Sequence, residues 1–266
     1  MCLIAFAWQS HPRWPLLMIA NRDEFHARPT RPADFLADAV DVYGGVDLRA
    51  GGSWLLVSTR SRLAAVTNVR VGRAADAAPR SRGELVRSFA ASDATATDFI
   101  AGLAPLAHEY GRFNLLLWDG VSLHCVGNHP RLHAQEIAPG VHAMSNAELD
   151  TPWPKVRRAG AALSHWLGEQ PDTDAPPDIA PLFVALADRM PAGDAELPDT
   201  GVGPELERLL SPPFVAGETY GTRCSTLVLA GRDGIDVIER RFGANGAFKG
   251  ERAVQLAHGP SRQPLR

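Results

Sequence analysis

The sequence predicts an α+β fold in which antiparallel sheets are covered by helices. Segments typical of strands and helices follow one another in the order strands, helices, strands, helices, strands. The short turns Asp119-Gly120 and Asp233-Gly234 join neighbouring apolar runs, and two-residue turns of this kind connect antiparallel strands. The 266 residues contain no internal repeat and no long linker, so we expect a single domain over residues 1–266.

The N-terminal segment predicts a buried hairpin. Residues 2–8 are apolar on both alternating faces, which indicates a strand covered on both sides. Residues 9–13 have the composition of a turn, and residues 16–20 form a second apolar run. Asn21-Arg22-Asp23-Glu24 breaks this run abruptly, so the returning strand is expected to end in a dense polar cluster near the start of the first strand.

The middle of the chain predicts further strands and two helices. A capping-box pattern at Ser81 and Glu84 indicates that a helix begins at about Gly83. We expect a loop between Gly44-Gly45 and Gly51-Gly52, strands over 53–59, 63–68, 113–118, 122–127 and near 142–145, and helices over 83–91 and, despite Pro105, 97–110.

The C-terminal half predicts two more helices and a last hairpin. Helical periodicity covers residues 154–167 and 179–189, and loops rich in Pro and Asp cover 169–177 and 191–204. The last hairpin is expected from residues 222–230 and 235–241. The tail from about residue 258 is expected to fray.

Composition excludes several classes of protein. An apolar content of 45% and a charged content of 21% are typical of globular chains and exclude a disordered one. The net charge of −3 argues against a nucleic-acid partner. No apolar run approaches the length of a membrane span, and the first residues do not resemble a signal peptide. Of the 27 basic residues only Lys155 and Lys249 are lysines, an excess of Arg that we attribute mainly to codon bias.

Cysteine usage indicates a reduced, cytoplasmic protein. The three cysteines, Cys2, Cys125 and Cys224, are too few for a disulfide framework, and no Cys-x-x-Cys motif indicates a zinc site. Phosphate-binding loops and dinucleotide fingerprints are also absent, which argues against a nucleotide cofactor. We therefore expect no required cofactor and no metal.

Cys2 is the strongest candidate for a catalytic residue. Removal of Met1 would place a free α-amine on the residue that carries a thiol, and that amine can serve as the base for its own side chain. The alternative is that Cys2 is a small apolar residue at the start of a buried strand.

Five polar residues are candidates for a site around Cys2. Arg22 would favour the thiolate and Asp23 could orient the α-amine. Asn146, after a predicted strand, could donate a hydrogen bond to a developing oxyanion. Asn21 and Asn68 are candidates for substrate binding. Each of these residues also has an ordinary interpretation, as part of a solvated turn or as a helix cap.

Arg223 opens the last predicted hairpin and could bring a cation to the same pocket, although it could also be an ordinary surface arginine. Trp8, Trp54 and Phe25 could form apolar walls of this pocket or belong to the ordinary core.

A series of short motifs resembles the NRDE protein family, which includes the transport and Golgi organisation 2 homologues. The motifs run in order over about residues 1–226 and are specific as a set. They are Met-Cys-Leu-Ile at 1–4, Ala-Asn-Arg-Asp-Glu-Phe at 20–25 with Arg28-Pro29, Gly-Gly-Ser-Trp-Leu at 51–55, Ala-Val-Thr-Asn at 65–68, Ser-Arg-Gly-Glu-Leu at 81–85, Phe-Asn-Leu at 113–115, Ser-Asn-Ala at 145–147, Thr-Pro-Trp at 151–153 and Tyr-Gly-Thr-Arg at 220–223.

The resemblance implies a fold like that of the N-terminal-nucleophile (Ntn) hydrolases, a four-layer αββα sandwich of two antiparallel sheets. It is distantly similar to bile-salt hydrolases and penicillin V acylases, which cleave amide bonds. Carried over to this chain, it implies Cys2 as nucleophile, Arg22 and Asp23 as residues that shape its protonation, Asn146 as oxyanion donor and Arg223 as support for the thiolate. In the acylases the Arg and Asp are separated by two residues, whereas here they are adjacent, so the resemblance does not assign which acidic residue faces Cys2.

Three functional hypotheses follow. The first is a cysteine hydrolase that cleaves a non-peptide amide, or a thioester, through an acyl intermediate on Cys2. The second is a non-catalytic protein that binds or carries haem or an acyl lipid in the same cleft, as the resemblance to the family implies. The third, which we consider the weakest, is a metal or haem site built from His124, Cys125, His129 and His133.

Overall fold

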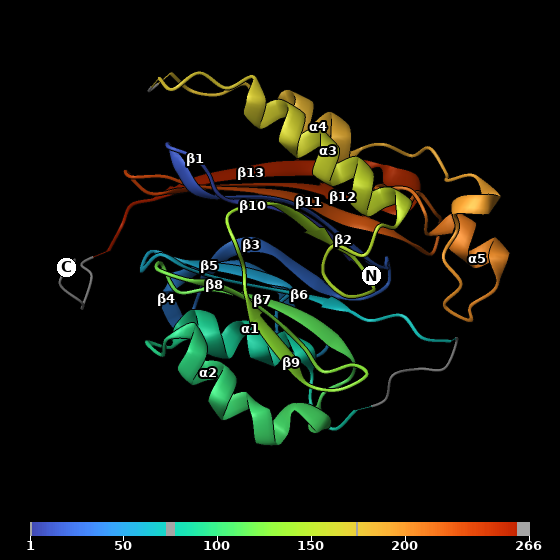
Figure 1. Ribbon diagram of the computed structural model, residues 1–266, viewed down its shortest axis with the longest axis horizontal. Coiled ribbons are helices and arrows are strands. Elements are labelled where there is room, and N and C mark those ends of the chain that lie inside the picture. The colour runs from blue at the N-terminus through green and yellow to red at the C-terminus, as the bar shows by residue number, and fades with distance from the viewer. Residues whose placement is uncertain (1, 73–77, 174, 260–266) are drawn as a thin grey trace.

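Two antiparallel sheets lie face to face, and helices cover the outer face of each (Figure 1). The computed structural model describes residues 2–72, 78–173 and 175–259, with the backbone of Cys2 but not its side chain. Two stacked sheets between helical layers confirm the predicted αββα sandwich. No helix in the described part of the chain has both the length and the apolar character that a membrane span requires.

The first sheet has six strands and holds both the N-terminal hairpin and the last hairpins of the chain. Its strand order is β10-β1-β2-β11-β12-β13. The strands are β1 (Cys2–His11), β2 (Trp14–Phe25), β10 (Gly140–Met144), β11 (Tyr220–Ala230), β12 (Ile235–Phe242) and β13 (Phe248–Leu256). The N-terminal strands β1 and β2 are therefore central, with neighbours on both sides.

The second sheet has seven strands in sequence order, β3 to β9. They are β3 (Thr30–Leu36), β4 (Ala39–Asp47), β5 (Leu55–Ser58), β6 (Arg62–Asn68), β7 (Phe113–Trp118), β8 (Leu123–Gly127) and β9 (His133–Glu136). Each strand pairs antiparallel with the next, and the connection between β6 and β7 contains α1 (Arg82–Ala91) and α2 (Ala96–Leu103).

Three apolar layers hold the sandwich together. Phe6, Met18 and Trp118 belong to the core between the two sheets. Helix α1 (Arg82–Ala91) covers the outer face of the seven-stranded sheet, together with α2 (Ala96–Leu103) and the 3₁₀ turn η1 (Ala104–Glu109). Helices α3 (Pro154–Gly168) and α4 (Ala180–Leu186) cover the six-stranded sheet. Each fully buried large apolar side chain stabilises the fold by about 1.5–3 kcal/mol.

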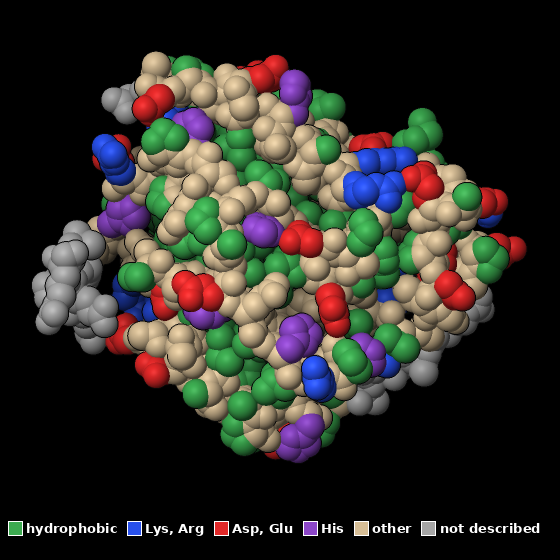
Figure 2. Space-filling model, in the orientation of Figure 1, with side chains coloured by type: hydrophobic (Ala, Val, Ile, Leu, Met, Phe, Trp, Pro, Cys, Tyr) green, Lys and Arg blue, Asp and Glu red, His purple; other side chains and the backbone are tan. Residues whose placement is uncertain are grey.

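The surface seen in Figure 2 mixes charges of both signs. Acidic and basic side chains are interspersed with apolar and neutral ones over this face.

The short elements η2 (Asp194–Glu196), α5 (Pro204–Leu209) and η3 (Ala244–Gly246) complete the structure.

Several local predictions need correction. Asn21-Arg22-Asp23-Glu24 does not break the second strand, because β2 runs through to Phe25 with β1 and β11 paired on either side. The predicted helix over 97–110 is split at Ala104, where Pro105 opens the 3₁₀ turn. Helix α1 begins near the predicted residue, but the Ser81 side chain makes no capping hydrogen bond, and Glu84 pairs with Arg80 instead.

Four strands and two helices also differ from expectation. Strands β3, β4, β9 and β13 were not predicted, and Gly44-Gly45 lies within β4 rather than at the edge of a loop. Helix α4 is shorter than the predicted 179–189, and α5 begins at the end of a predicted loop. His258 and Gly259 bond to Gly231 and Thr59, and residues 260–266 lie outside the described residues, so the predicted fraying of the tail stays a prediction.

Candidate functional site

The registers of the first sheet bring distant residues into one lateral row. Cys2 is the Cα partner of Arg22, Arg22 is the partner of Cys224, and Cys224 is the partner of Arg241. The row therefore crosses β1, β2, β11 and β12. On the other side of β1, Ile4 pairs with Met144, the last residue of β10, and Asn146 follows two residues later in the bend after this strand.

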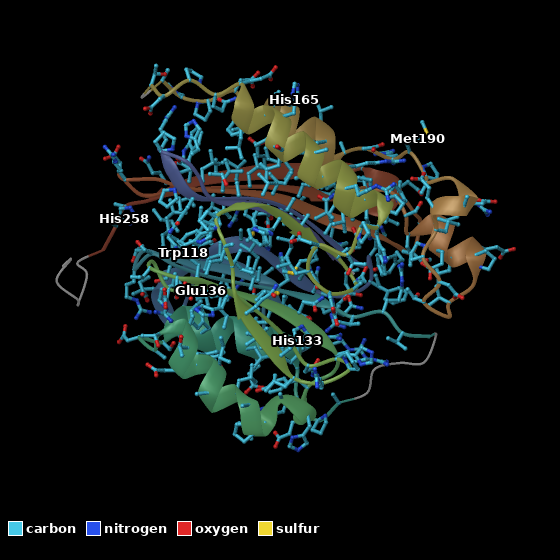
Figure 3. The ribbon with its side chains drawn as sticks, in the orientation of Figure 1. Trp118, His133, Glu136, His165, Met190 and His258 are labelled. Carbon is cyan, nitrogen blue, oxygen red and sulfur yellow. The ribbon has the colours of Figure 1, made fainter. Side chains whose placement is uncertain are left out.

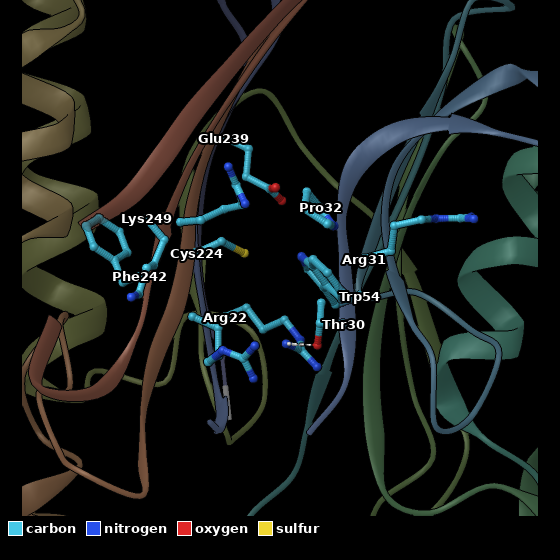
Figure 4. A pocket seen from close by; sticks show the side chains of 11 residues that line it. Arg22, Thr30, Arg31, Pro32, Trp54, Cys224, Glu239, Phe242 and Lys249 are labelled. Atoms are coloured by element: carbon cyan, nitrogen blue, oxygen red, sulfur yellow. Dashed lines mark hydrogen bonds between the residues drawn. The ribbon is translucent and has the colours of Figure 1, made fainter. Parts of the chain in front are cut away.

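A cavity of about 320 Å³ lies between the two sheets next to this row. Figure 4 shows Arg22, Cys224 and Glu239 on one wall and Thr30, Pro32 and Trp54 on the other. Its volume lies at the lower end of the range for small-molecule sites. Of the predicted site residues, Arg22 and Arg223 line this cavity, and Trp54 is the one predicted apolar wall that does so.

Arg22 is held in place by an aromatic ring. Its side chain is 6% exposed, and its guanidinium carbon lies 4.2 Å from the centroid of the Trp54 ring. Its Nη1 donates to Thr30 Oγ1 at 3.4 Å. Gly45 leaves room for the indole, because a Cβ at this position would lie 2.2 Å from the Trp54 ring. A cation is thus fixed beside the strand position of Cys2.

Asp23 lies on the opposite face of the sheet from Arg22, because side chains alternate along a strand. Its carboxylate is buried and accepts a hydrogen bond of 2.7 Å from Thr222 Oγ1. Burial raises the pKa of Asp23, and the opposing effects of Lys155 on α3 and of the Thr222 hydrogen bond do not cancel it. Glu24, the other acidic residue of the tetrapeptide, is half-buried and lies near Arg28.

Arg223 occupies a bulge in β11. The register with β2 shifts between Thr222 and Cys224, so Arg223 is the extra residue. Its Nη1 donates to the carbonyl oxygens of Phe25 at 2.8 Å and Arg28 at 3.1 Å. Burial lowers its pKa, and the like charge of Arg22 lowers it further. The bulge thus aims a second guanidinium at the cavity that Arg22 lines.

Asn68 and Asn146 form an amide pair that links the two sheets. Asn146 Nδ2 donates to Asn68 O and to Asn68 Oδ1, both at 3.0 Å. The backbone oxygen of Asn146 accepts from Arg70 N at 2.8 Å. Both N–H donors of the Asn146 side chain are therefore engaged, and a donation to an oxyanion requires one of them to be exchanged.

Asn21 serves the packing of the sheet against the segments outside it. Its Nδ2 donates to Leu186 O at 2.8 Å and Pro213 O at 2.9 Å, and its Oδ1 accepts from Ser225 Oγ at 2.6 Å. It faces the same side as Asp23, away from the 320 Å³ cavity. Asn21 is thus buried and hydrogen-bonded within the protein, and the half-buried Asn68 is hydrogen-bonded to Asn146.

The other two cysteines are buried thiols. Cys125 belongs to the core between the sheets, where burial raises its pKa to about 12. Cys224 lines the cavity and donates its S–H to Glu239. The side chain of Cys2 and all of Met1 lie outside the described residues.

Glu239 is a cavity residue that sequence reasoning missed. It is 3% exposed, and its Oε1 accepts from Ala33 N at 2.9 Å. The alternation along β12 could have indicated it. Ile235 and Val237 point into the core between the sheets, and Glu239 is the next residue on the same face of the strand. Burial raises the pKa of Glu239 in spite of the nearby charges of Arg241 and Arg22.

Glu239→Gln should become more stable relative to the unaltered protein as pH rises. Because its pKa is raised on folding, Glu239 stabilises the fold when protonated, and this contribution is lost as pH rises from the ordinary glutamate pKa through the folded one. Glutamine does not ionise and can still accept from Ala33. Urea unfolding of both proteins at several mildly acidic to neutral pH values measures the difference. If the difference in unfolding free energy between the two proteins stays constant with pH, the raised pKa of Glu239 is contradicted.

Among the described residues, neither the histidines nor the cysteines assemble a metal site. In the described ranges, no three side chains of His, Cys, Asp or Glu gather as metal ligands. Figure 3 shows His133, His165 and His258 well separated on different parts of the molecule. Cys125 is directed into the core between the sheets, so the predicted cluster of His124, Cys125, His129 and His133 does not form.

Comparison with known proteins decides the family. The family profile described as Transport and Golgi organisation 2 matches residues 1–244. The chain belongs to the Transport and Golgi organisation 2 family. The homologue from Mus musculus is 33% identical over 253 residues, which cover 88% of this chain and 90% of that protein. The homologue from Homo sapiens is 32% identical over the same share of both chains.

A solved structure outside this family confirms the Ntn-hydrolase-like fold. A Caenorhabditis elegans orthologue of N-acylethanolamine-hydrolyzing acid amidase superposes with a TM-score of 0.53. The match covers 86% of this chain and 92% of that one at 10% sequence identity, so it concerns the fold alone. This member of the Transport and Golgi organisation 2 family thus has an Ntn-hydrolase-like sandwich, and Arg22, the Cα partner of Cys2, lines a cavity between its sheets.

Proposed function

We propose that the protein is an Ntn-type cysteine hydrolase that cleaves a non-peptide amide or a thioester through Cys2 after removal of Met1. The observation that carries the proposal is the register of β1 and β2, in which Arg22 at the wall of the cavity is the direct Cα partner of Cys2. A guanidinium next to a thiol favours the nucleophilic thiolate. If Cys2 were an ordinary core residue, the buried Arg22 would have no thiolate to stabilise.

The proposed reaction has two steps. The α-amine of the mature Cys2 accepts the thiol proton, and the sulfur attacks the carbonyl carbon of the substrate. Collapse of the tetrahedral intermediate breaks the bond to the leaving amine or thiol, which takes up the proton from the α-ammonium. A water molecule then attacks the Cys2 thioester and releases the carboxylic acid, so one water is consumed for each bond cleaved.

The surrounding residues have distinct proposed roles. Arg22 stabilises the thiolate, with Arg223 supporting it from the bulge of β11. Asp23, buried beneath α3 and one residue beyond Arg22, orients the α-amine. Asn146 donates to the oxyanion after exchanging one of its hydrogen bonds with Asn68. Asn68 then positions this amide, and any contact of Asn21 with substrate would have to replace its present bonds.

Intact mass and labelling test the proposal directly. We expect the mass of the purified protein to correspond to loss of Met1. We then expect p-nitrophenyl acetate to acetylate Cys2, with an initial burst of nitrophenolate that is absent in Cys2→Ala. Peptide mapping locates the acetyl group.

Cys125 and Cys224 provide internal controls for this labelling. The Cys125 thiol, with a pKa of about 12, should stay unmodified in the folded protein. Cys125→Ala and Cys224→Ala should both keep the burst. Retention of Met1, or acetylation of Cys224 in place of Cys2, would refute the mechanism.

The carrier hypothesis, in which the cavity holds haem or an acyl lipid without catalysis, stays a prediction. Titration with haemin discriminates it from the enzyme. A saturable shift of the Soret band together with no burst on Cys2 would favour the carrier, whereas a burst without a Soret shift would favour the hydrolase.

A further inference from the structure

Four arginines and Lys249 line the cavity, and the side chain of one of them, Arg31, extends away from it (Figure 4). Arg22, Arg223 and Arg241 all line it, and in the described part of the chain none of their guanidinium groups forms an ion pair. By contrast, Arg28 and Arg240 on neighbouring segments each pair with a carboxylate. The acid that lines the cavity is Glu239, whose pKa burial raises, so it compensates the three cations poorly.

Arg241 has no role in the proposed chemistry, yet the strand is built to hold it at the cavity. Its Nε is buried without a hydrogen-bond partner among the described residues. Its Cα partner on β13 is Gly250, where a Cβ would lie 2.8 Å from Arg241 Nη2. A side chain at position 250 would therefore displace the guanidinium. Arg240, the residue before Arg241, lies on the opposite face of the strand. Its guanidinium carbon is 3.7 Å from the centroid of the Phe183 ring.

An anion in the cavity would offset the charges of Arg223 and Arg241, which are both half-buried. Burial of a charge without an opposite charge or full hydrogen bonding destabilises a protein. The pKa of Arg223 is lowered by burial and by the like charge of Arg22 on the neighbouring strand β2. A planar guanidinium matches the oxygens of carboxylate or phosphate with two parallel hydrogen bonds.

We propose that the cavity binds an anionic group of the substrate, a carboxylate or a phosphate, between Arg241 and Arg223. This inference rests on the proposed function, because it assigns the substrate class of the Cys2 site: an amide or thioester whose acyl or leaving part carries a negative charge. Trp54 and Phe242 on the walls of the cavity contact the apolar part of the same molecule. Arg22 is then left to stabilise the Cys2 thiolate.

Probes with one chain and different head groups test the inference. Octyl phosphate and octanoate should bind, measured by calorimetry, and octylammonium should not. Arg241→Ala should weaken the preferred anion by about 10- to 100-fold, the usual effect of losing a charge-assisted hydrogen bond. Comparison of the two anions shows whether phosphate or carboxylate is preferred, and inorganic phosphate should compete with octyl phosphate.

Arg240→Ala is the matched control, since it removes an adjacent arginine from the opposite face of β12 and should leave binding unchanged. Arg241→Gln and Arg241→Lys are measured as well, so that the result does not depend on the folding of one variant. Glutamine should reproduce the loss, and lysine should recover part of the affinity. Equal binding of octylammonium, or equal affinity in Arg241→Ala and Arg240→Ala, would overturn the inference.

The same binding measurement in Cys2→Ala separates the inference from the proposed function. We expect anion binding to persist in this variant, because it lacks only the thiol. If the unaltered protein gives no p-nitrophenyl acetate burst but binds the anions in an Arg241-dependent way, the hydrolase is refuted and the anion site is kept. A Cys2-dependent burst with no Arg241-dependent binding would do the reverse.

Discussion

Glu207→Ala should lower the free energy of unfolding by about 3–5 kcal/mol, because it leaves a buried arginine without its counter-ion. Glu207 and Arg70 are 2% and 3% exposed, and Arg70 Nη2 lies 2.5 Å from Glu207 Oε2. The second carboxylate oxygen accepts from Thr200 N at 2.9 Å. Burial already lowers the pKa of Arg70 in spite of the attraction of Glu207. Urea denaturation followed by circular dichroism measures the loss.

Glu205→Ala is the control for this prediction, since Glu205 lies on the same helix α5 and is exposed. It should change the unfolding free energy by well under 1 kcal/mol. The double variant Arg70→Met with Glu207→Leu should regain much of the stability, because it removes both charges. A single Glu207→Ala variant as stable as Glu205→Ala would contradict the role of the pair. Because Arg70 N bonds to Asn146 O, the loss should also disturb the amide pair of Asn68 and Asn146.

Arg22→Met should slow acetylation of Cys2 by about 10-fold at pH 7 and move the midpoint of its pH profile upward by about one unit or more. The reason is electrostatic: an adjacent guanidinium favours the thiolate, and methionine removes the charge while keeping an unbranched chain against Trp54. The measurement is the rate of the nitrophenolate burst as a function of pH.

Arg22→Lys distinguishes electrostatics from packing in this experiment. Lysine restores the charge but not the planar stack on Trp54, so the pH midpoint should return most of the way toward that of the unaltered protein. Arg13→Met provides a matched control, because Arg13 also stacks on a tryptophan but lies at the far end of the hairpin. Its guanidinium carbon is 4.5 Å from the centroid of the Trp14 ring. An unchanged pH profile in Arg22→Met, or an equal shift in Arg13→Met, would remove Arg22 from the mechanism.

The elements that the sequence predicted well are those with strong internal patterns. Strands β1, β6, β7 and β12 carry apolar side chains on at least one face, and α3 has a clear helical period. Three of the missed strands, β3, β9 and β13, are edge strands with mostly exposed or half-buried side chains. Such strands are held by backbone hydrogen bonds to a neighbour, which leave little trace in composition.

Strand β4 was missed for a different reason. Gly44-Gly45 has the composition of a loop, but a Cβ at Gly44 would lie 2.5 Å from Leu55 O and one at Gly45 would meet the Trp54 ring. The glycines therefore permit close approach within the sheet instead of ending a strand. This role of the glycines can be recognised only from the position of Trp54, which depends on the packing of the whole sandwich.

The sequence alone predicted the fold class, the family and part of the cavity lining, namely Arg22, Arg223 and Trp54. An excess of arginine was visible, but nothing local separated Arg241 from the arginines of the surface. The tertiary structure decided which side chains share a space: Arg22 faces the cavity while its neighbour Asp23 lies beneath α3, and Arg241 and Glu239 join Arg22 from strands far along the chain. The physical reason is that alternation along a strand assigns neighbours to opposite faces, whereas lateral register depends on the packing of the complete sheet.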